Sequence, residues 1–152
     1  MKIKLILLFV AALSISNALW AQNGEIENVK TVVNRMFEGM RNGDSAAVRA
    51  VLADRIIMQT VVAEDGAETR VATGDVNRFL KAVGTPHTDV WDERIEFGQV
   101  LVDGNLASVW TPYQFYLGSK LSHCGVNSFQ LVRLPEGWKI VFLIDTRRKD
   151  CK

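Results

Sequence analysis

Residues 120–148 read KLSHCGVNSFQLVRLPEGWKIVFLIDTRR, which is two long apolar-rich runs on either side of Pro135-Glu136-Gly137. Val, Ile, Phe and Trp are frequent in both runs, as is typical of β-strands. Two such runs joined by a short turn predict an antiparallel hairpin. The expected strands are 120–134 and 138–146.

Two further β-prone runs precede this hairpin, at 90–102 and 105–117. The dipeptides Asp103-Gly104 and Gly118-Ser119 separate the runs, and both are typical of tight turns. Four long strands joined by tight turns predict an antiparallel meander in the C-terminal half of the chain.

The chain before residue 90 has a mainly helical pattern. Apolar residues recur every three or four positions from Ile26 to Met40, which predicts one helix with an apolar stripe. Asn23 is the expected N-cap of this helix, and Asp44 and Asp75 are the expected N-caps of two shorter helices. The third helix is expected to end at Gly84.

A short hairpin is expected between the second and third helices. The run 55–62 is rich in Ile, Met and Val, and the stretch 69–72 follows it. Asp65-Gly66 between them is a strong turn signal. The expected order is therefore helix, helix, hairpin, helix and four strands.

The N-terminus has the pattern of a cleavable secretory signal. Lys2 and Lys4 precede an apolar run over 5–15, and the small residues Ala18 and Ala21 follow it. The run has about 11 residues, whereas a membrane-spanning helix needs roughly 20. We expect a signal peptide at 1–21, with cleavage after Ala21 or, as second choice, Ala18. The remaining single domain, 22–152, is then exported, either to the periplasm or out of the cell.

Charge and cysteine content limit the partners of the mature chain. The full chain has 18 Lys plus Arg and 17 Asp plus Glu, so loss of two lysines leaves a net charge of about −1. This value gives no electrostatic basis for binding nucleic acid, and no membrane contact is expected after cleavage. Cys124 and Cys151 would meet an oxidising compartment, which favours a disulfide; two free thiols are the alternative.

This order of elements, with Asn42-Gly43-Asp44 and the segments 123–131 and 137–148, resembles the nuclear transport factor 2-like (NTF2-like) superfamily. Within it, the chain is most similar to the small bacterial "putative lumazine-binding" or SnoaL-like group. The resemblance covers Glu25 to Cys151. It implies an α+β cone in which three N-terminal helices pack on a curved, mostly antiparallel sheet. It also implies a pocket at the open end, and a homodimer.

The turn positions give an expected strand register. Without bulges, Asn127 lies opposite Asp145 and Trp110, and Gln114 lies opposite His123. A bulge would shift these pairs by one residue. The inward face would then form a pocket with an apolar floor and a polar mouth. The predicted ligand-binding residues are Phe97, Trp110, Gln114, His123, Asn127, Asp145 and Arg147.

Two functions fit such a pocket. The first is a noncatalytic module that binds a small, partly apolar molecule beside Trp110 and Phe97. The second is a SnoaL-like or ketosteroid-isomerase-like enzyme, an isomerase, dehydratase or cyclase with His123 or Asp145 as the proton-transfer group. The catalytic residues of known members do not map individually onto this chain. Purely structural roles remain the alternative: core packing for the aromatic residues, and a surface ion pair between Asp145 and Arg147.

Several common chemistries have no support in the sequence. The motifs Gly-x-Ser-x-Gly, Gly-x-x-x-x-Gly-Lys and Gly-x-Gly-x-x-Gly are absent. His123 and Cys124 are adjacent in an expected strand, so they point to opposite faces and cannot share a metal ion. We expect neither a cofactor nor a metal site.

Overall fold

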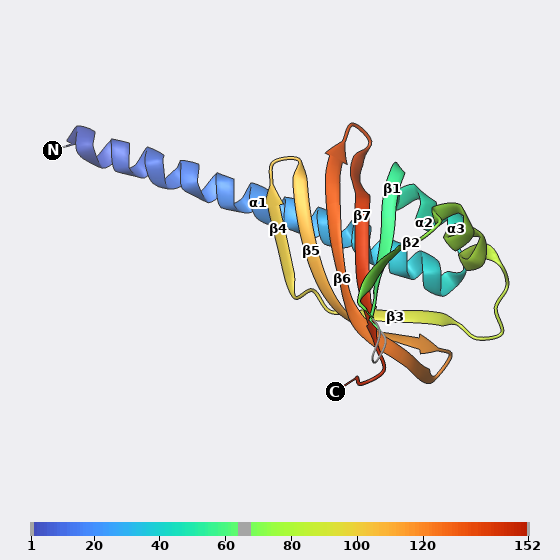
Figure 1. The fold of residues 1–152 in the computed structure, drawn as a ribbon. Coiled ribbons are helices and arrows are strands. Elements are labelled where there is room, and N and C mark those ends of the chain that lie inside the picture. Colours follow the sequence, from blue (N-terminus) through green and yellow to red (C-terminus); the bar gives the residue numbers. More distant parts are fainter. Residues whose placement is uncertain (1, 64–67, 152) are drawn as a thin grey trace.

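The computed structural model describes residues 2–63 and 68–151, and the side chains within those ranges from residue 22 onward. It contains three helices and seven strands in this part of the chain (Figure 1). No helix in the described ranges has an apolar stretch long enough to cross a membrane. The elements are α1 (Lys2–Asn42), α2 (Ser45–Val51), β1 (Leu52–Val62), β2 (Arg70–Thr73), α3 (Val76–Gly84), β3 (Trp91–Ile95), β4 (Gln99–Asp103), β5 (Leu106–Leu117), β6 (Lys120–Leu134) and β7 (Gly137–Arg148).

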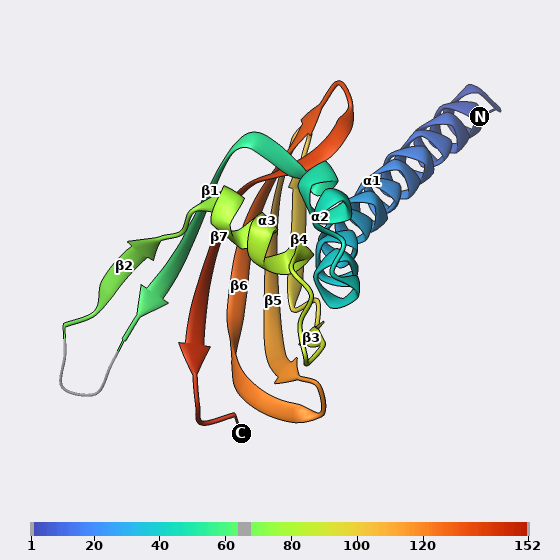
Figure 2. The ribbon, with the colours of Figure 1, turned by 90° about the vertical axis from the view of Figure 1, so that its right-hand side faces the viewer.

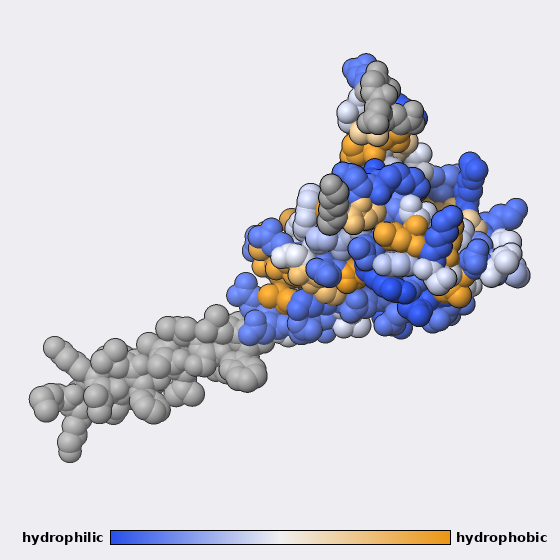
Figure 3. All heavy atoms as spheres, turned by 90° about the horizontal axis from the view of Figure 1, so that it is seen from below, coloured by the Kyte–Doolittle hydropathy of each residue, from blue (hydrophilic) through white to orange (hydrophobic). Residues whose placement is uncertain are grey.

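The strands form one curved, mixed sheet in the order β2-β1-β7-β6-β5-β3, and β4 also pairs with β5. Among the described strand pairs, only β1 with β7 is parallel. The three helices lie on the same side of the sheet (Figure 2). Seen from below, the described surface is largely hydrophilic, with separate hydrophobic patches (Figure 3). The predicted α+β cone, with three helices on a mostly antiparallel sheet, is confirmed.

Helix α1 supplies much of the core. Its predicted apolar stripe is buried, because side chains three and four positions apart lie on one helix face. The Phe37 ring meets the Phe129 ring of β6 edge to face, with 6.0 Å between ring centroids. The expected N-cap at Asn23 is wrong, since α1 begins at Lys2 and continues through residue 23. The buried stripe consists of Val29, Val33, Met36, Phe37 and Met40.

The other local predictions for the helices are confirmed. The Ala47 backbone N–H donates to Asp44 Oδ1 at 2.8 Å, and the Arg78 N–H donates to Asp75 Oδ1 at 2.9 Å. Each aspartate therefore satisfies a free donor in the first turn of its helix. Gly43, with φ of 67°, makes the turn that ends α1. The predicted turn at Asp65-Gly66 lies outside the described residues.

The run 90–102 was expected to be one strand, and the structure corrects this. β3 ends at Ile95 and β4 begins at Gln99, so 96–98 form a bulge against β5. Pro112 of β5 lies opposite the break, and proline has no N–H to continue a ladder. The bulge is held by Glu96 N–H to Pro112 O at 2.9 Å and by Gly98 N–H to Trp110 O at 3.0 Å.

A second bulge changes the register between β5 and β6. Near the turn, Tyr116 pairs with Leu121, but Phe115 pairs with His123, so Ser122 is the extra residue. Every later pair is shifted by one, which moves side chains to the opposite face. The expected partners of Trp110 and Gln114 are therefore wrong: Trp110 lies opposite Ser128, and Gln114 lies opposite Cys124. The expected pair of Asn127 with Asp145 is confirmed.

Candidate functional site

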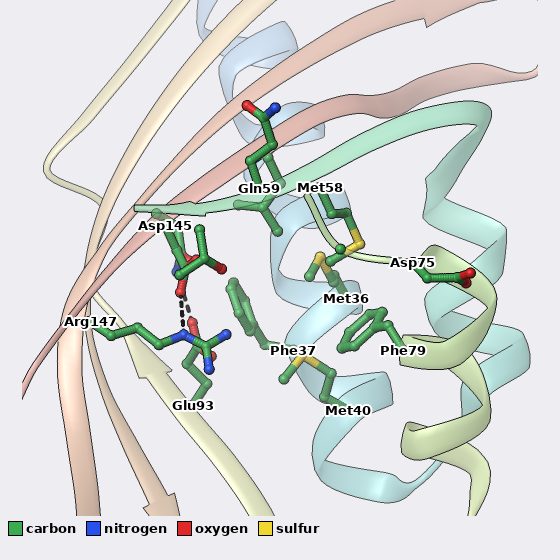
Figure 4. Close-up of a pocket in the computed structure, with 14 residues that line it drawn as sticks. Met36, Phe37, Met40, Met58, Gln59, Asp75, Phe79, Glu93, Asp145 and Arg147 are labelled. Carbon is green, nitrogen blue, oxygen red and sulfur yellow. Dashed lines mark hydrogen bonds and ion pairs between the residues drawn. The ribbon is translucent and has the colours of Figure 1, made fainter. Parts of the chain in front are cut away.

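A cavity of about 210 Å³ lies between α1, α3 and the concave face of the sheet. Figure 4 shows side chains of the two helices facing side chains of β3 and β7 across this space. The cavity is lined by Met36, Phe37, Met40, Met58, Gln59, Thr60, Gly74, Asp75, Phe79, Glu93, Asn127, Leu143, Asp145 and Arg147.

The helical wall of the cavity is apolar. Met36, Phe37 and Met40 lie on the buried face of α1, and Phe79 comes from the face of α3 that packs on the core. Thioether side chains are flexible and polarisable, so they adapt to ligands of different shape. This wall can hold the body of an apolar molecule by contact.

The sheet contributes most of the polar groups of the cavity, beside the apolar Met58 and Leu143. Asn127 Nδ2 donates to Glu93 Oε1 at 2.8 Å, and Arg147 Nε donates to Asp145 Oδ2 at 2.9 Å. Asp145 and Arg147 are two residues apart on β7 and so lie on the same face, and Asn127 is paired with Asp145 across the ladder. The sheet thus places four hydrogen-bonding side chains opposite the apolar helices.

Glu93 has the most perturbed carboxyl group of this wall. Burial raises the pKa of Glu93 to about 7, and the Asn127 hydrogen bond offsets this only in part. The charge of Asp145 raises the pKa further, and that of Arg147 lowers it. Glu93 therefore exchanges a proton near neutral pH. It was not among the predicted site residues, although it lies two positions before Ile95 and therefore on the same face of β3.

Tyr113 links β5 to β7 beneath this wall. Its hydroxyl donates to Thr146 O at 2.9 Å and lies 3.4 Å from Asp145 Oδ2. Gly125, its partner on β6, allows this crossing, because a Cβ there would lie 2.8 Å from Tyr113 Cε1 and would overlap the Thr146 carbonyl. Burial raises the pKa of Tyr113, as do the charges of Asp145 and Glu93. The expected register concealed Tyr113, since it placed position 113 on the outer face.

Four of the seven predicted ligand-binding residues do not line the cavity. Trp110 is 50% exposed on the outer face, and Gln114, also on that face, accepts a hydrogen bond from the Tyr116 hydroxyl at 3.1 Å. Phe97 lies in the bulge between β3 and β4, partly buried against the core, with Lys30 Nζ 5.8 Å from its ring centroid.

His123 is the fourth predicted ligand-binding residue that does not line the cavity. Its ring lies 4.9 Å from the Phe115 ring and 5.8 Å from the Tyr113 ring, measured between centroids. It borders a separate hollow with Arg147, Arg148 and Lys149. Burial lowers the pKa of His123, and the charges of Arg147 and Lys149 lower it further. Asn127, Asp145 and Arg147 are the predicted residues that the fold brings together at the cavity.

Cys124 and Cys151 are joined by a disulfide, with 5.7 Å between their Cα atoms. The bond ties the C-terminal tail to β6 at a distance from the cavity, because neither cysteine lines it. Over the described ranges, no cluster of three or more His, Cys, Asp or Glu side chains is arranged to hold a metal ion.

No protein-family model matches the chain, and no curated protein matches it significantly. Solved structures do match. An NTF2-like protein with a cystatin-like fold from Novosphingobium aromaticivorans has 16% identity and a TM-score of 0.69, covering 91% of this chain and 89% of that one. An NTF2-like protein of unknown function from Shewanella baltica has 15% identity and a TM-score of 0.65, with coverage of 84% and 96%.

A third similar structure carries a proposed activity. It is described as a "putative dehydratase from the NTF2-like family" from Streptomyces avermitilis, with 19% identity, a TM-score of 0.60, and coverage of 83% of this chain and 97% of that one. Identities this low establish the fold and not the activity. They also do not distinguish the groups within the superfamily. Helices on the concave face of a curved mixed sheet, and these matches over most of the chain, give one conclusion: the chain has the NTF2-like fold.

Proposed function

We propose that this protein is an exported NTF2-fold protein that binds a small, partly apolar molecule in the cavity between α1, α3 and the sheet. The observation that carries the proposal is the division of the cavity into an apolar helical wall and a hydrogen-bonding sheet wall. Ligand sites commonly combine apolar contact area with a few polar groups that orient the ligand.

The cavity volume limits the size of the ligand. A protein cavity of roughly 150 Å³ accommodates benzene. The cavity here is about 210 Å³, which is room for one ring with a short substituent. Because the cavity borders Arg147, whose side chain is 59% exposed, the polar end of such a ligand would lie toward solvent.

The methionines provide a direct test. Met36, Met40 and Met58 are the methionines that follow the expected cleavage site, and all three line the cavity. With ¹³C-labelled methionine methyl groups, titration with toluene is expected to shift all three NMR signals. The Trp110→Ala variant, altered on the outer face, should respond in the same way. Methyl signals that do not move at saturating toluene would contradict the proposal.

A second measurement identifies the natural ligand. The mature protein would be purified from its own host and unfolded, and the released small molecules would be analysed by mass spectrometry. A stoichiometric compound of roughly single-ring size would support the proposal. Such a compound would also test the narrower proposal that the protein belongs to the "putative lumazine-binding" or SnoaL-like group.

Enzymatic proton transfer is the second candidate. His123 does not line the cavity, so Asp145 is the sequence-predicted group that could act there. Asp145 already accepts from Arg147 and lies close to the Tyr113 hydroxyl, an arrangement that suits an anchoring role. Binding without turnover is therefore the better-supported function.

Export is part of the proposal because of the signal pattern at 1–21. Expression of the full chain, followed by mass determination of the extracytoplasmic product, tests it. The expected product begins at Gln22. Recovery of the intact chain from the cytoplasm would contradict the proposal.

We also infer that the outer face of the sheet forms a homodimer interface. Trp110 and Leu101 lie on that face and are 50% and 55% exposed, and an apolar surface of this kind is commonly covered by a partner. Analytical ultracentrifugation should give a dimer for the wild-type protein and a monomer for Trp110→Arg. A monomeric wild-type protein at high concentration would contradict the interface.

A further inference from the structure

Glu93 faces the cavity without a cationic partner of its own. The Asn127 amide donates to Oε1 of Glu93, and among the described residues no hydrogen bond reaches Oε2. The nearby guanidinium of Arg147 directs its Nε–H to Asp145 instead. A partly buried carboxylate bound by one neutral amide is poorly compensated when ionised.

With Glu93 ionised, the charged side chains of the sheet that line the cavity, Glu93, Asp145 and Arg147, have a net negative charge. Asp145 is 12% exposed and Arg147 is 59% exposed, so the cation is the better screened of the two. Asp75 caps α3, and its carboxylate points away from Glu93 (Figure 4). The groups facing Glu93 are Asp145 and Arg147 from β7, Asn127 from β6, Tyr113 from β5, and the apolar Met36, Phe37 and Met40 from α1.

The helical wall suits the apolar body of a cationic ligand. Phe37 of α1 and Phe79 of α3 line the cavity on its helical side (Figure 4). Aromatic rings pack well against a further ring in an offset or edge-to-face arrangement. A ligand that packs its apolar body here and places an ammonium group near the sheet would thus gain from both walls.

We propose that the cavity binds a small primary amine with an aromatic or branched apolar body, its ammonium group donating to Glu93 and its body packed against Phe37 and Phe79. This inference rests on the proposed binding function, and it names the class of ligand.

The pH dependence of binding follows from the protonation of Glu93. An alkylammonium group, with a pKa near 10, stays charged between pH 6 and 8. Glu93, with its pKa raised to about 7, is mostly protonated at pH 6 and mostly ionised at pH 8. If the ionised form binds the amine, the apparent affinity rises about ten-fold over this interval.

The test uses three probes of matched shape: 2-phenylethylamine, 2-phenylethanol and phenylacetate. Their binding to the mature protein would be measured by isothermal titration calorimetry at pH 6 and pH 8. At pH 8 the amine is expected to bind at least about ten-fold more tightly than the alcohol. Glu93→Gln should abolish this advantage and its pH dependence. Glu96→Gln, an exposed glutamate three positions away, is the matched control.

Three results would overturn the inference. These are an alcohol that binds as tightly as the amine, a preference for phenylacetate, and an amine affinity that does not change between pH 6 and 8. The last needs no variant, so it holds even if Glu93→Gln does not fold. If toluene still shifts the methionine signals while the amine fails, binding in the cavity stands and only the ligand class is wrong. If toluene fails as well, both proposals are wrong.

Discussion

Asp92 and Glu93 are adjacent carboxylates on β3, yet their surroundings have little in common. Asp92 accepts from Arg41 at 2.7 Å and from Arg94 at 2.8 Å, and its side chain is only 7% exposed. Glu93, on the other side of the strand, has a neutral amide as its hydrogen-bond partner. Because successive side chains of a strand point to opposite faces, one position separates a structural ion pair from the wall of the cavity.

The two carboxylates meet the cost of burial differently. A buried charge must be paired or must lose its charge. Asp92 has two guanidinium partners and so ties the end of α1 to β3. Glu93 keeps its proton more readily, as the rise of its pKa to about 7 shows. In the proposal above, the ammonium group of the ligand supplies the partner that Glu93 lacks.

The largest expected effect comes from adding a side chain at Gly125 of β6, where the Tyr113 side chain crosses the strand. Gly125→Ala places a Cβ against the Thr146 carbonyl and the Tyr113 ring, so β6 and β7 must separate. Overpacking of this severity is expected to lower the free energy of unfolding by about 3 kcal/mol, measured by urea denaturation. Gly74→Ala is the control, since its nearest neighbour would be at an ordinary 3.6 Å. Equal stability of both variants would contradict the crossing of Tyr113.

Removing the charge of Asp92 is expected to have the next largest effect. In Asp92→Asn, Arg41 and Arg94 lose their shared carboxylate, and the loss is reduced because both guanidiniums are more than half exposed. A decrease in unfolding free energy of about 2 kcal/mol is expected by urea denaturation. Asp89→Asn, an exposed aspartate in the preceding loop, should change stability by less than about 0.5 kcal/mol. No difference between the two variants would mean that the ion pair contributes nothing.

Neutralising Glu93 should increase the stability of the protein near neutral pH, whereas the two preceding substitutions decrease it. The folded protein holds the Glu93 proton up to a pKa of about 7, whereas the unfolded chain releases it at the ordinary, lower pKa. Wild-type stability should therefore fall as pH rises from about 4.5 to 7 and stay level above that. Glu93→Gln lacks this loss, so its stability relative to wild type should rise by on the order of 2 kcal/mol between pH 5 and 8. Thermal unfolding at both pH values measures the difference.

The Glu93 prediction has a matched control. Glu96→Gln changes an exposed carboxylate of the same type, so its stability should follow wild type at both pH values. A Glu93→Gln variant that also follows wild type would mean that Glu93 titrates normally. The contrast between the two neighbouring carboxylates would then rest on the ion pair of Asp92 alone.

The smallest expected effect comes from removing the Tyr113 hydroxyl, which links β5 to β7. Tyr113→Phe removes the hydrogen bond to Thr146 O and leaves the ring in place. One neutral hydrogen bond contributes about 1 kcal/mol, so a loss of that size is expected in urea denaturation. Tyr116→Phe is the control, because its hydroxyl donates to the exposed side chain of Gln114. A larger loss in the control would contradict the role assigned to Tyr113.

Sequence reasoning found the local features of this molecule and about half of its predicted site. The caps at Asp44 and Asp75 depend on residues three positions apart, so they could be predicted. Asn127 and Asp145 were also paired correctly, because two deviations cancel. The strand pairing starts at Gly137, one residue earlier than expected, and the bulge beyond Gln130 shifts the register back by one. Trp110 and Tyr113 each lie on the face opposite to the one expected. The reason is that the extra residue at Ser122 shifts the pairing of β5 with β6 by one position.

The order and type of the elements were therefore already present in the sequence, since they follow from periodicity, turn residues and caps that act over a few positions. The contents of the cavity were decided by tertiary structure. The bulges at 96–98 and Ser122 arise from how β5 meets its neighbours, and they select which side chains face α1. The proton affinity of Glu93 likewise comes from burial against α1, β6 and β7, which are distant in sequence and which only the folded sheet brings together.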